Sequence, residues 1–479
     1  MPGTWPAVAK VCYSAVVVRP LARRIGRRLA SLPPWSILLA GWLYLIVYAF
    51  PGIMTQDSFD HLREARDRLY SDGHPPAINL LWKICDYIVA GPFLMLVIQS
   101  SCILAGLYLV MRRLFDPRPA AWIATAVFVF PPVMVPFAVI WKDPLMAGFL
   151  MLGFVALLSP RRGIRILGLV SMFCATSVRY NAIAATLPLV VLLFEWQPGL
   201  HWLKRYAIAA IAWVVVTLSA FQLNARLADH KLELWSSIAV FDIVGTLAFV
   251  DEDIPDPELE KLFEGTDLLV HTNIHGVARY LYTPKDFLPV TNHPTRTMWS
   301  LPINGYTPPP EPQLKAIARA WKQTLSSYPV AYAKHRISVM AEVVGLGEVR
   351  ASGAIAKRDF RWPEQAHQMG LGTGWSRTQR ALTRAYVFIV RHTPIFTVWM
   401  YIVVALLLLP LALRQRDVLA LLLSGLGLET TLLLLAPSPD YRYSHWLVIC
   451  TITSAIILGV RRYRASKSVR VASKHDRVG

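Results

Sequence analysis

Residues 119–159 read PAAWIATAVFVFPPVMVPFAVIWKDPLMAGFLMLGFVALLS, two apolar runs separated by the polar island Trp141-Lys142-Asp143. The runs, 119–140 and 144–159, approach the length of about 17–25 residues that a helix needs to cross a hydrocarbon core. This stretch therefore predicts two helices that cross a membrane and meet at one of its surfaces, beside Lys142 and Asp143.

Runs of the same kind recur along the 479 residues of the chain. They lie near 35–51, 92–111, 164–178, 181–195, 206–223, 394–413, 418–436 and 444–460. Apolar residues make up 55% of the chain and charged residues 16%, and the mean hydropathy is positive, a composition that excludes an ordinary soluble globular protein. We predict an all-α polytopic membrane protein with about ten transmembrane helices in a cell inner (plasma) membrane.

The net charge of +19 is distributed as a topology signal. Basic residues gather before the first run, in short connections and in the tail, where the positive-inside rule operates. The long segment 225–393 is nearly balanced, with 19 Lys and Arg against 17 Asp and Glu, as expected of a translocated domain. Membrane lipids are therefore the expected surroundings, and a nucleic-acid partner is not predicted.

Sidedness depends on 76–90, because a crossing there would place Arg112 and Arg113 outside and invert every later basic loop. Lys83 and Asp86 fit a helix lying on the outer surface instead. Both termini are then cytoplasmic. The predicted organisation is a basic N-terminus (1–33), a transmembrane module (34–224) with outer loop 52–91, an extracytoplasmic domain (225–393), C-terminal transmembrane helices (394–460) with outer loop 437–443, and a basic tail (461–479).

The outer segment 225–393 is long enough to fold. Residues 284–312 are rich in proline and predict extended coil, whereas 313–346 has the spacing of an amphipathic helix or a helical pair. The glycine cluster 370–374 predicts a flexible loop near the active face. The five cysteines show no metal or disulfide spacing, and we expect five free thiols.

Polar islands at the ends of the apolar runs share the predicted outer face. They are Thr55-Gln56-Asp57, Trp141-Lys142-Asp143 and Asp440-Tyr441-Arg442-Tyr443. Asp57 opens a surface helix that runs to Tyr70, where an aspartate is equally explained as a helix cap. His74-Pro75-Pro76 begins a second surface helix, since proline is tolerated in the first turn. His74 is either a solvated turn residue or part of the same rim.

Three cations belong to this outer face: Lys142, Arg442 and Arg179, the last in the motif Arg179-Tyr180-Asn181. Each could merely reach toward lipid headgroups. Together they oppose the usual distribution of basic residues and indicate a site for an anion. A lipid phosphate is the obvious candidate, because guanidinium and ammonium groups bind phosphate oxygens and an aspartate facing them could accept a proton.

The order of these motifs resembles the GT-C superfamily of membrane glycosyltransferases, nearest to its protein O-mannosyltransferase and aminoarabinose transferase branch. The resemblance covers the first six predicted helices and the last outer loop, and does not extend to 225–393. It implies a GT-C-like fold with two outer-surface helices in the first loop. It also implies transfer of a sugar from a polyprenyl-phosphate donor to a lipid, glycan or protein acceptor on the outer face.

The resemblance also implies roles for particular residues. Asp57 would be the catalytic base, and the donor phosphate would be bound by Lys142, Arg442 and Arg179. The cavity would be lined by His74, Asp143, Tyr443 and Asn181. The first loop lacks an Asp-x-Asp motif, because Asp57 and Asp60 are three residues apart. This departure favours a metal-independent mechanism while leaving a divalent cation open.

Other classes of protein are also compatible with the helices. A lipid-linked sugar transporter or flippase would carry ionisable groups at mid-depth along its pathway, and the predicted spans hold almost none beyond Glu195 and Glu429. The role of Glu429 is left open. A scaffold for envelope assembly would explain the helices but not the outer cations beside Asp57.

Overall fold

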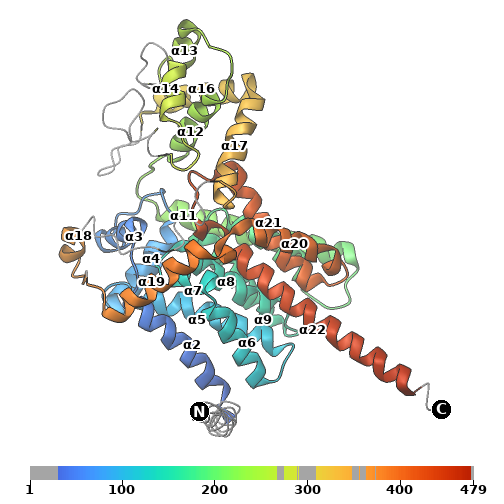
Figure 1. Cartoon of the computed structure of the whole chain (residues 1–479). Coiled ribbons are helices and arrows are strands. Elements are labelled where there is room, and N and C mark those ends of the chain that lie inside the picture. The colour runs from blue at the N-terminus through green and yellow to red at the C-terminus, as the bar shows by residue number, and fades with distance from the viewer. Residues whose placement is uncertain are drawn as a thin grey trace, which may run out of the picture.

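The computed structural model describes residues 31–266, 274–287, 290, 309–347, 355, 363–372 and 374–475. In this part of the chain the regular structure consists of helices and two isolated bridges, without a strand (Figure 1). The all-α prediction is confirmed for these residues.

Each apolar run of the sequence contains a helix. The helices are α2 (Pro34–Ala49), α5 (Phe93–Arg112), α6 (Pro117–Val129) followed by α7 (Pro131–Phe137), α8 (Lys142–Leu157), α9 (Arg162–Val178), α10 (Ala182–Leu193), α11 (Trp202–Leu227), α20 (Val398–Ala412), α21 (Arg416–Leu435) and α22 (His445–His475). One large hydrophobic core joins them into a bundle.

The count of ten transmembrane helices is too high by length and composition. Among the described residues, four helical segments are long and apolar enough to cross a membrane: α5, α11, α21 and Tyr441–Lys467. A fifth is obtained if α6 and α7, which bend by 71° at their junction, form one broken span. The other runs form shorter helices because turns take up their ends. The 16 residues of α2, for example, extend about 24 Å, less than the hydrocarbon core.

Apolar side chains are exposed along the outside of the bundle. On α2, Leu39, Leu43 and Val47 follow one another at intervals of four residues, and α11 exposes Ile211 and Leu218. An exposed apolar stripe on a helix is suited to contact with lipid tails rather than water. The exposed faces thus agree with a multi-pass membrane protein.

The first loop contains the two expected helices, α3 (Gln56–Asp67) and α4 (Pro76–Ile88), at one end of the bundle (Figure 1). Pro76 occupies the first turn of α4, where its missing N–H costs nothing. Arg66 joins the two helices through paired hydrogen bonds to Asp86, of 2.9 and 2.8 Å. Trp82 is fully buried beneath them.

A smaller lobe stands beyond this end of the bundle. It consists of α12 (Trp235–Ala248), α13 (Asp256–Phe263), α14 (Ile274–Leu281), α16 (Glu311–Ser327) and α17 (Pro329–Val343), around a second hydrophobic core (Figure 1). The helical pair predicted over 313–346 is confirmed as α16 and α17. Most of the predicted coil 284–312 lies outside the described residues.

A buried charge network ties the lobe to the bundle. Asp242 forms an ion pair of 2.5 Å with Arg336 and accepts a hydrogen bond of 3.0 Å from the Trp321 indole. Arg336 also donates to the carbonyl oxygen of Ala436, at the end of α21. The lobe is therefore attached to the chain just before the island that begins at Asp440.

Segment 225–393 also contains α18 (Pro363–Gln368) and α19 (Arg377–His392). Helix α19 packs on α2, where the hydroxyl groups of Tyr44 and Tyr386 lie 2.7 Å apart. The glycine cluster joins α18 to α19, and its Thr373 lies outside the described residues. The described cysteines are free thiols: Cys85, Cys102, Cys174 and Cys450; Cys12 falls outside the described residues.

Candidate functional site

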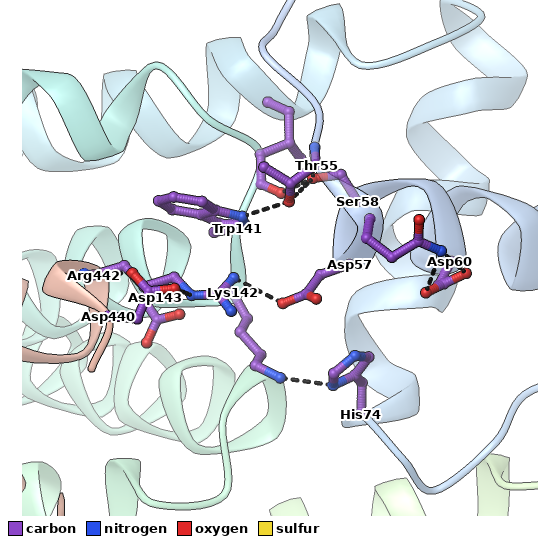
Figure 2. Close-up of polar contacts among 12 residues, drawn as sticks. Thr55, Asp57, Ser58, Asp60, His74, Trp141, Lys142, Asp143, Asp440 and Arg442 are labelled. Atoms are coloured by element: carbon purple, nitrogen blue, oxygen red, sulfur yellow. Dashed lines mark hydrogen bonds and ion pairs between the residues drawn. The ribbon is translucent and has the colours of Figure 1, made fainter. Parts of the chain in front are cut away.

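Backbone contacts hold the first two polar islands together. Ile53 pairs with Val139 in an isolated parallel bridge, and the Ile53 carbonyl accepts the Ile140 N–H at 3.0 Å. The indole of Trp141 donates to the Thr55 hydroxyl at 2.8 Å. The segment after α2 is consequently fixed beside the start of α8, which carries Lys142 (Figure 2).

The start of α3 is capped by Thr55 and not by Asp57. Thr55 is the N-cap of α3, and its N–H donates to the Ser58 hydroxyl at 3.1 Å. The Asp57 carboxylate instead forms an ion pair of 2.7 Å with Arg442. Burial opposes its ionisation, but Arg442, ahead of the other cationic groups nearby, lowers the pKa of Asp57 below its usual range. Asp57 is therefore a carboxylate at neutral pH.

Arg442 has two carboxylate partners. Besides Asp57, its Nε atom lies 2.8 Å from Asp440, whose other oxygen accepts the Arg442 backbone N–H at 3.2 Å. The guanidinium also lies over the rings of Trp141, 4.7 Å from its centroid, and Tyr443, at 5.3 Å. Arg442 is thus held firmly and its charge is balanced within the protein.

Lys142 is balanced differently. Its ammonium lies 2.7 Å from Nδ1 of His74, and it forms no ion pair with a carboxylate in the described part of the chain (Figure 2). Burial, with Arg179 nearby, lowers the pKa of Lys142 to about 8, so it stays mostly charged at neutral pH. Burial and then Lys142 lower the pKa of His74 below its usual range. The Lys142 ammonium therefore donates a hydrogen bond to Nδ1 of a neutral His74.

The ring of His61 packs against the ring of His74, with 4.7 Å between their centroids. Its Nδ1 lies 2.6 Å from the side-chain oxygen of Asn79, while the side-chain NH₂ of Asn79 donates to the Glu64 carboxylate at 2.6 Å. This orientation makes His61 the donor to Asn79. Burial lowers the pKa of His61 to about 4, so this second imidazole is also neutral.

Arg179 is the third cation of the site, and it is buried. Its guanidinium forms a 2.7 Å ion pair with the buried carboxylate of Asp143, donates to the Asn181 side chain at 2.8 Å, and lies 5.1 Å from the ring centroid of Tyr443. Its charge therefore neutralises Asp143, and Tyr443 lies between the two arginines.

The structure brings together all eight residues that the sequence nominated: Asp57, Lys142, Arg442, Arg179, His74, Asp143, Tyr443 and Asn181. It adds Asp440, Trp141 and His61 to them. His61 follows Asp57 by four residues, a spacing that places both on one face of α3 and that could have identified it. The roles assigned to these residues stay predictions.

The described residues contain no group of three or more His, Cys, Asp or Glu side chains arranged to hold a metal ion. Asp60, the next aspartate of α3 after Asp57, bonds to Arg63 at 2.6 Å and points away from Asp57 (Figure 2). Asp57 and Asp60 are therefore not paired in one site.

Glu429 lies inside the bundle on α21. It is buried and accepts a hydrogen bond of 2.9 Å from the Ser444 hydroxyl, while its second oxygen has no hydrogen-bond partner among the residues that the structure describes. Glu195, by contrast, lies between α10 and α11 and forms an ion pair of 2.8 Å with Arg205. Neither carboxylate contacts the cations of the candidate site.

No protein-family model, curated protein or solved structure matches this chain. The arrangement of charges in the site is therefore the evidence on which a function must be argued.

Proposed function

We propose that this protein is an integral membrane glycosyltransferase of GT-C type. It would move a sugar from a polyprenyl-phosphate donor to a lipid, glycan or protein acceptor on the outer face of the membrane. The observation that carries the proposal is Lys142, a half-buried ammonium without a carboxylate partner in the described residues, beside the ionised Asp57.

Lys142 is the proposed first contact of the donor phosphate. An ammonium has three N–H donors, and His74 uses one of them. The remaining donors are available to phosphate oxygens. Arg442, which contacts Asp57, would add a planar guanidinium, and Arg179 would add a third positive charge.

In the proposed reaction, the oxygen of an acceptor hydroxyl attacks the anomeric carbon. The bond from that carbon to the phosphate oxygen breaks, its electron pair leaves with the lipid phosphate, and the hydroxyl proton passes to Asp57. Lys142 and Arg442 would stabilise the charge that grows on the departing phosphate. The attack and departure on opposite faces would invert the anomeric configuration.

The ion pair with Arg442 makes Asp57 a weaker base. A carboxylate with a lowered pKa accepts protons poorly. A phosphate bound at Arg442 and Lys142 would offset their positive field and raise the pKa of Asp57. Donor binding would then prepare the base, so that an unoccupied site stays unreactive.

The orientation proposed from charge places both termini in the cytoplasm and the site at the outer surface. Supporting it, the site lies at the end of the bundle that also bears α3, α4 and the lobe (Figure 1). Basic residues such as Arg161 and Arg162 lie at the other ends of the helices, where α8 has ended and α9 begins.

The test uses purified protein with a radiolabelled polyprenyl-phosphate sugar and a membrane extract as the source of acceptor. We expect labelled product, and we expect Asp57→Asn to lower the initial rate by at least about 100-fold. Asp60→Asn is the matched control, since it removes an acid from the same helix that bonds to Arg63 instead. Near-normal transfer by Asp57→Asn would remove Asp57 as the base, and movement of label across vesicles without bond cleavage would favour a transporter.

A further inference from the structure

Helix α19 carries a basic stripe on the side that faces away from the bundle. The stripe consists of Arg377, Arg380, Arg384, Phe388 and Arg391, which are all exposed. Their spacings of three and four residues align them on one side of the helix. Four of the five residues of the stripe are arginines.

The opposite side of α19 anchors the helix to α2. The Gln379 side chain donates to the Phe50 carbonyl at 2.7 Å, and the buried ring of Tyr386 packs edge-on against Tyr48, 5.0 Å between centroids. Leu382 and Ile389 pack against the main core from the same side. The stripe therefore has a fixed direction, away from the protein.

The stripe has no counter-charge of its own. Helix α19 contains no acidic residue, and none of its arginines forms an ion pair with a carboxylate within the described ranges. Arg380 donates to a backbone carbonyl, that of Trp375. An ordinary solvated helix face would mix both signs of charge and would not expose a phenylalanine, yet the Phe388 side chain is 60% exposed within the stripe.

The ends of α19 place it at a particular level of the molecule. It begins beside Phe50, where α2 ends, and it leads through Pro394–Phe396 into α20. Phe396 packs against Tyr441, with 5.2 Å between ring centroids, next to the candidate site. Helix α19 thus crosses the outside of the bundle at the end where the apolar helices stop (Figure 1).

We infer that the basic stripe of α19 is a docking surface for the headgroups of anionic phospholipids. Guanidinium groups bind lipid phosphate oxygens in pairs, and an exposed aromatic ring among them can enter the adjoining acyl region. At the level where α2 ends, one membrane surface supplies both the phosphate groups for the arginines and the acyl region for the aromatic ring. This inference does not depend on the proposed sugar transfer.

The experiment is native mass spectrometry of the full-length protein in detergent, titrated with phosphatidylglycerol or with phosphatidylcholine. One basic residue at an anionic surface corresponds to about a fivefold change in affinity. We therefore expect Arg380→Gln/Arg384→Gln to weaken phosphatidylglycerol binding at least about fivefold and to leave phosphatidylcholine binding unchanged. Both side chains are exposed, so the variant should fold, which its thermal unfolding checks.

The matched control is Lys315→Gln/Lys322→Gln, which removes two exposed positive charges from α16 in the lobe. Unchanged phosphatidylglycerol binding by this control, together with the loss at the stripe, supports the inference. Wild-type affinity in the α19 variant would overturn it. Equal losses in both variants, or equal binding of the two lipids by the wild type, would also overturn it, because binding would then reflect overall charge or no charge at all.

Discussion

If Lys142 binds the donor phosphate as proposed, its lowered pKa predicts that donor binding depends on pH in a defined direction. The pKa is about 8 because burial, and then Arg179, disfavour the charged ammonium. A donor phosphodiester keeps one negative charge over the whole neutral and alkaline range, so the titration belongs to the protein. Bound phosphate favours the charged ammonium and binds best where Lys142 is already protonated.

The direction and size of the expected change in donor affinity with pH follow from the linkage between phosphate binding and the protonation of Lys142. The proposed affinity for the donor would be fully present about one pH unit or more below the pKa of Lys142 and would be lost as the pH rises through it. At pH 9 about a tenth of Lys142 carries its charge, against about nine tenths at pH 7, so the dissociation constant should rise about tenfold. Asp57 remains ionised throughout, because its pKa is lowered, and does not contribute to the change.

The assay is equilibrium binding of a short-chain polyprenyl-phosphate sugar, measured by microscale thermophoresis from pH 6.5 to 9.5 at constant ionic strength. Lys142→Arg keeps a positive charge that does not titrate in this range, and should bind with an affinity that is flat across it. Lys142→Met should bind weakly at every pH. A flat profile for the wild-type protein, or the same alkaline loss in Lys142→Arg, would refute the assignment of Lys142 as the titrating contact.

Three predictions concern the fold and are measured by unfolding in detergent. Trp82→Ala should lower the free energy of unfolding by about 3–5 kcal/mol, because it empties a fully buried site, and a loss below about 1 kcal/mol would contradict this packing. Gly245→Ala should make the lobe more sensitive to limited proteolysis, since an added Cβ would lie 2.2 Å from Nδ1 of His335. Unchanged resistance of the lobe would contradict this, because His335 would then have moved aside without cost. Tyr386→Phe removes the hydrogen bond to Tyr44 and should cost about 0.5–1.5 kcal/mol, and an equal loss with Tyr44→Phe is the check that one bond is shared.

Hydropathy predicted the helices well because each apolar run provides its own signal. It overestimated the membrane crossings, because a run such as 181–195 includes residues that form turns around the 12-residue helix α10. Periodicity also identified α16 and α17, whose apolar spacing is local. The packing of α19 on α2 joins Tyr386 to Tyr48, and no local pattern announces such a contact.

The candidate site could be anticipated from the ends of the apolar runs and from the sign of the neighbouring charges. Those features nominated Asp57, Lys142 and Arg442, which the structure places together. They could not show which site residues form ion pairs or hydrogen bonds with one another, because these contacts depend on distances between helices that are remote in sequence. The partnership of Lys142 with His74, rather than with a carboxylate, emerges only from the folded chain.

That pairing decides where an anion would bind. The site contains the carboxylates Asp57, Asp143 and Asp440, as many as its cations, yet they are shared unequally: Arg442 contacts Asp57 and Asp440, and Arg179 contacts Asp143. An anion approaching Arg442 meets the repulsion of two carboxylates, and one approaching Arg179 must enter a buried position. Lys142 offers a half-buried ammonium whose hydrogen-bond partner is a neutral imidazole. A phosphate bound at Lys142 would favour the charged form of the ammonium, and it would oppose the positive field that Lys142 and Arg442 exert on Asp57.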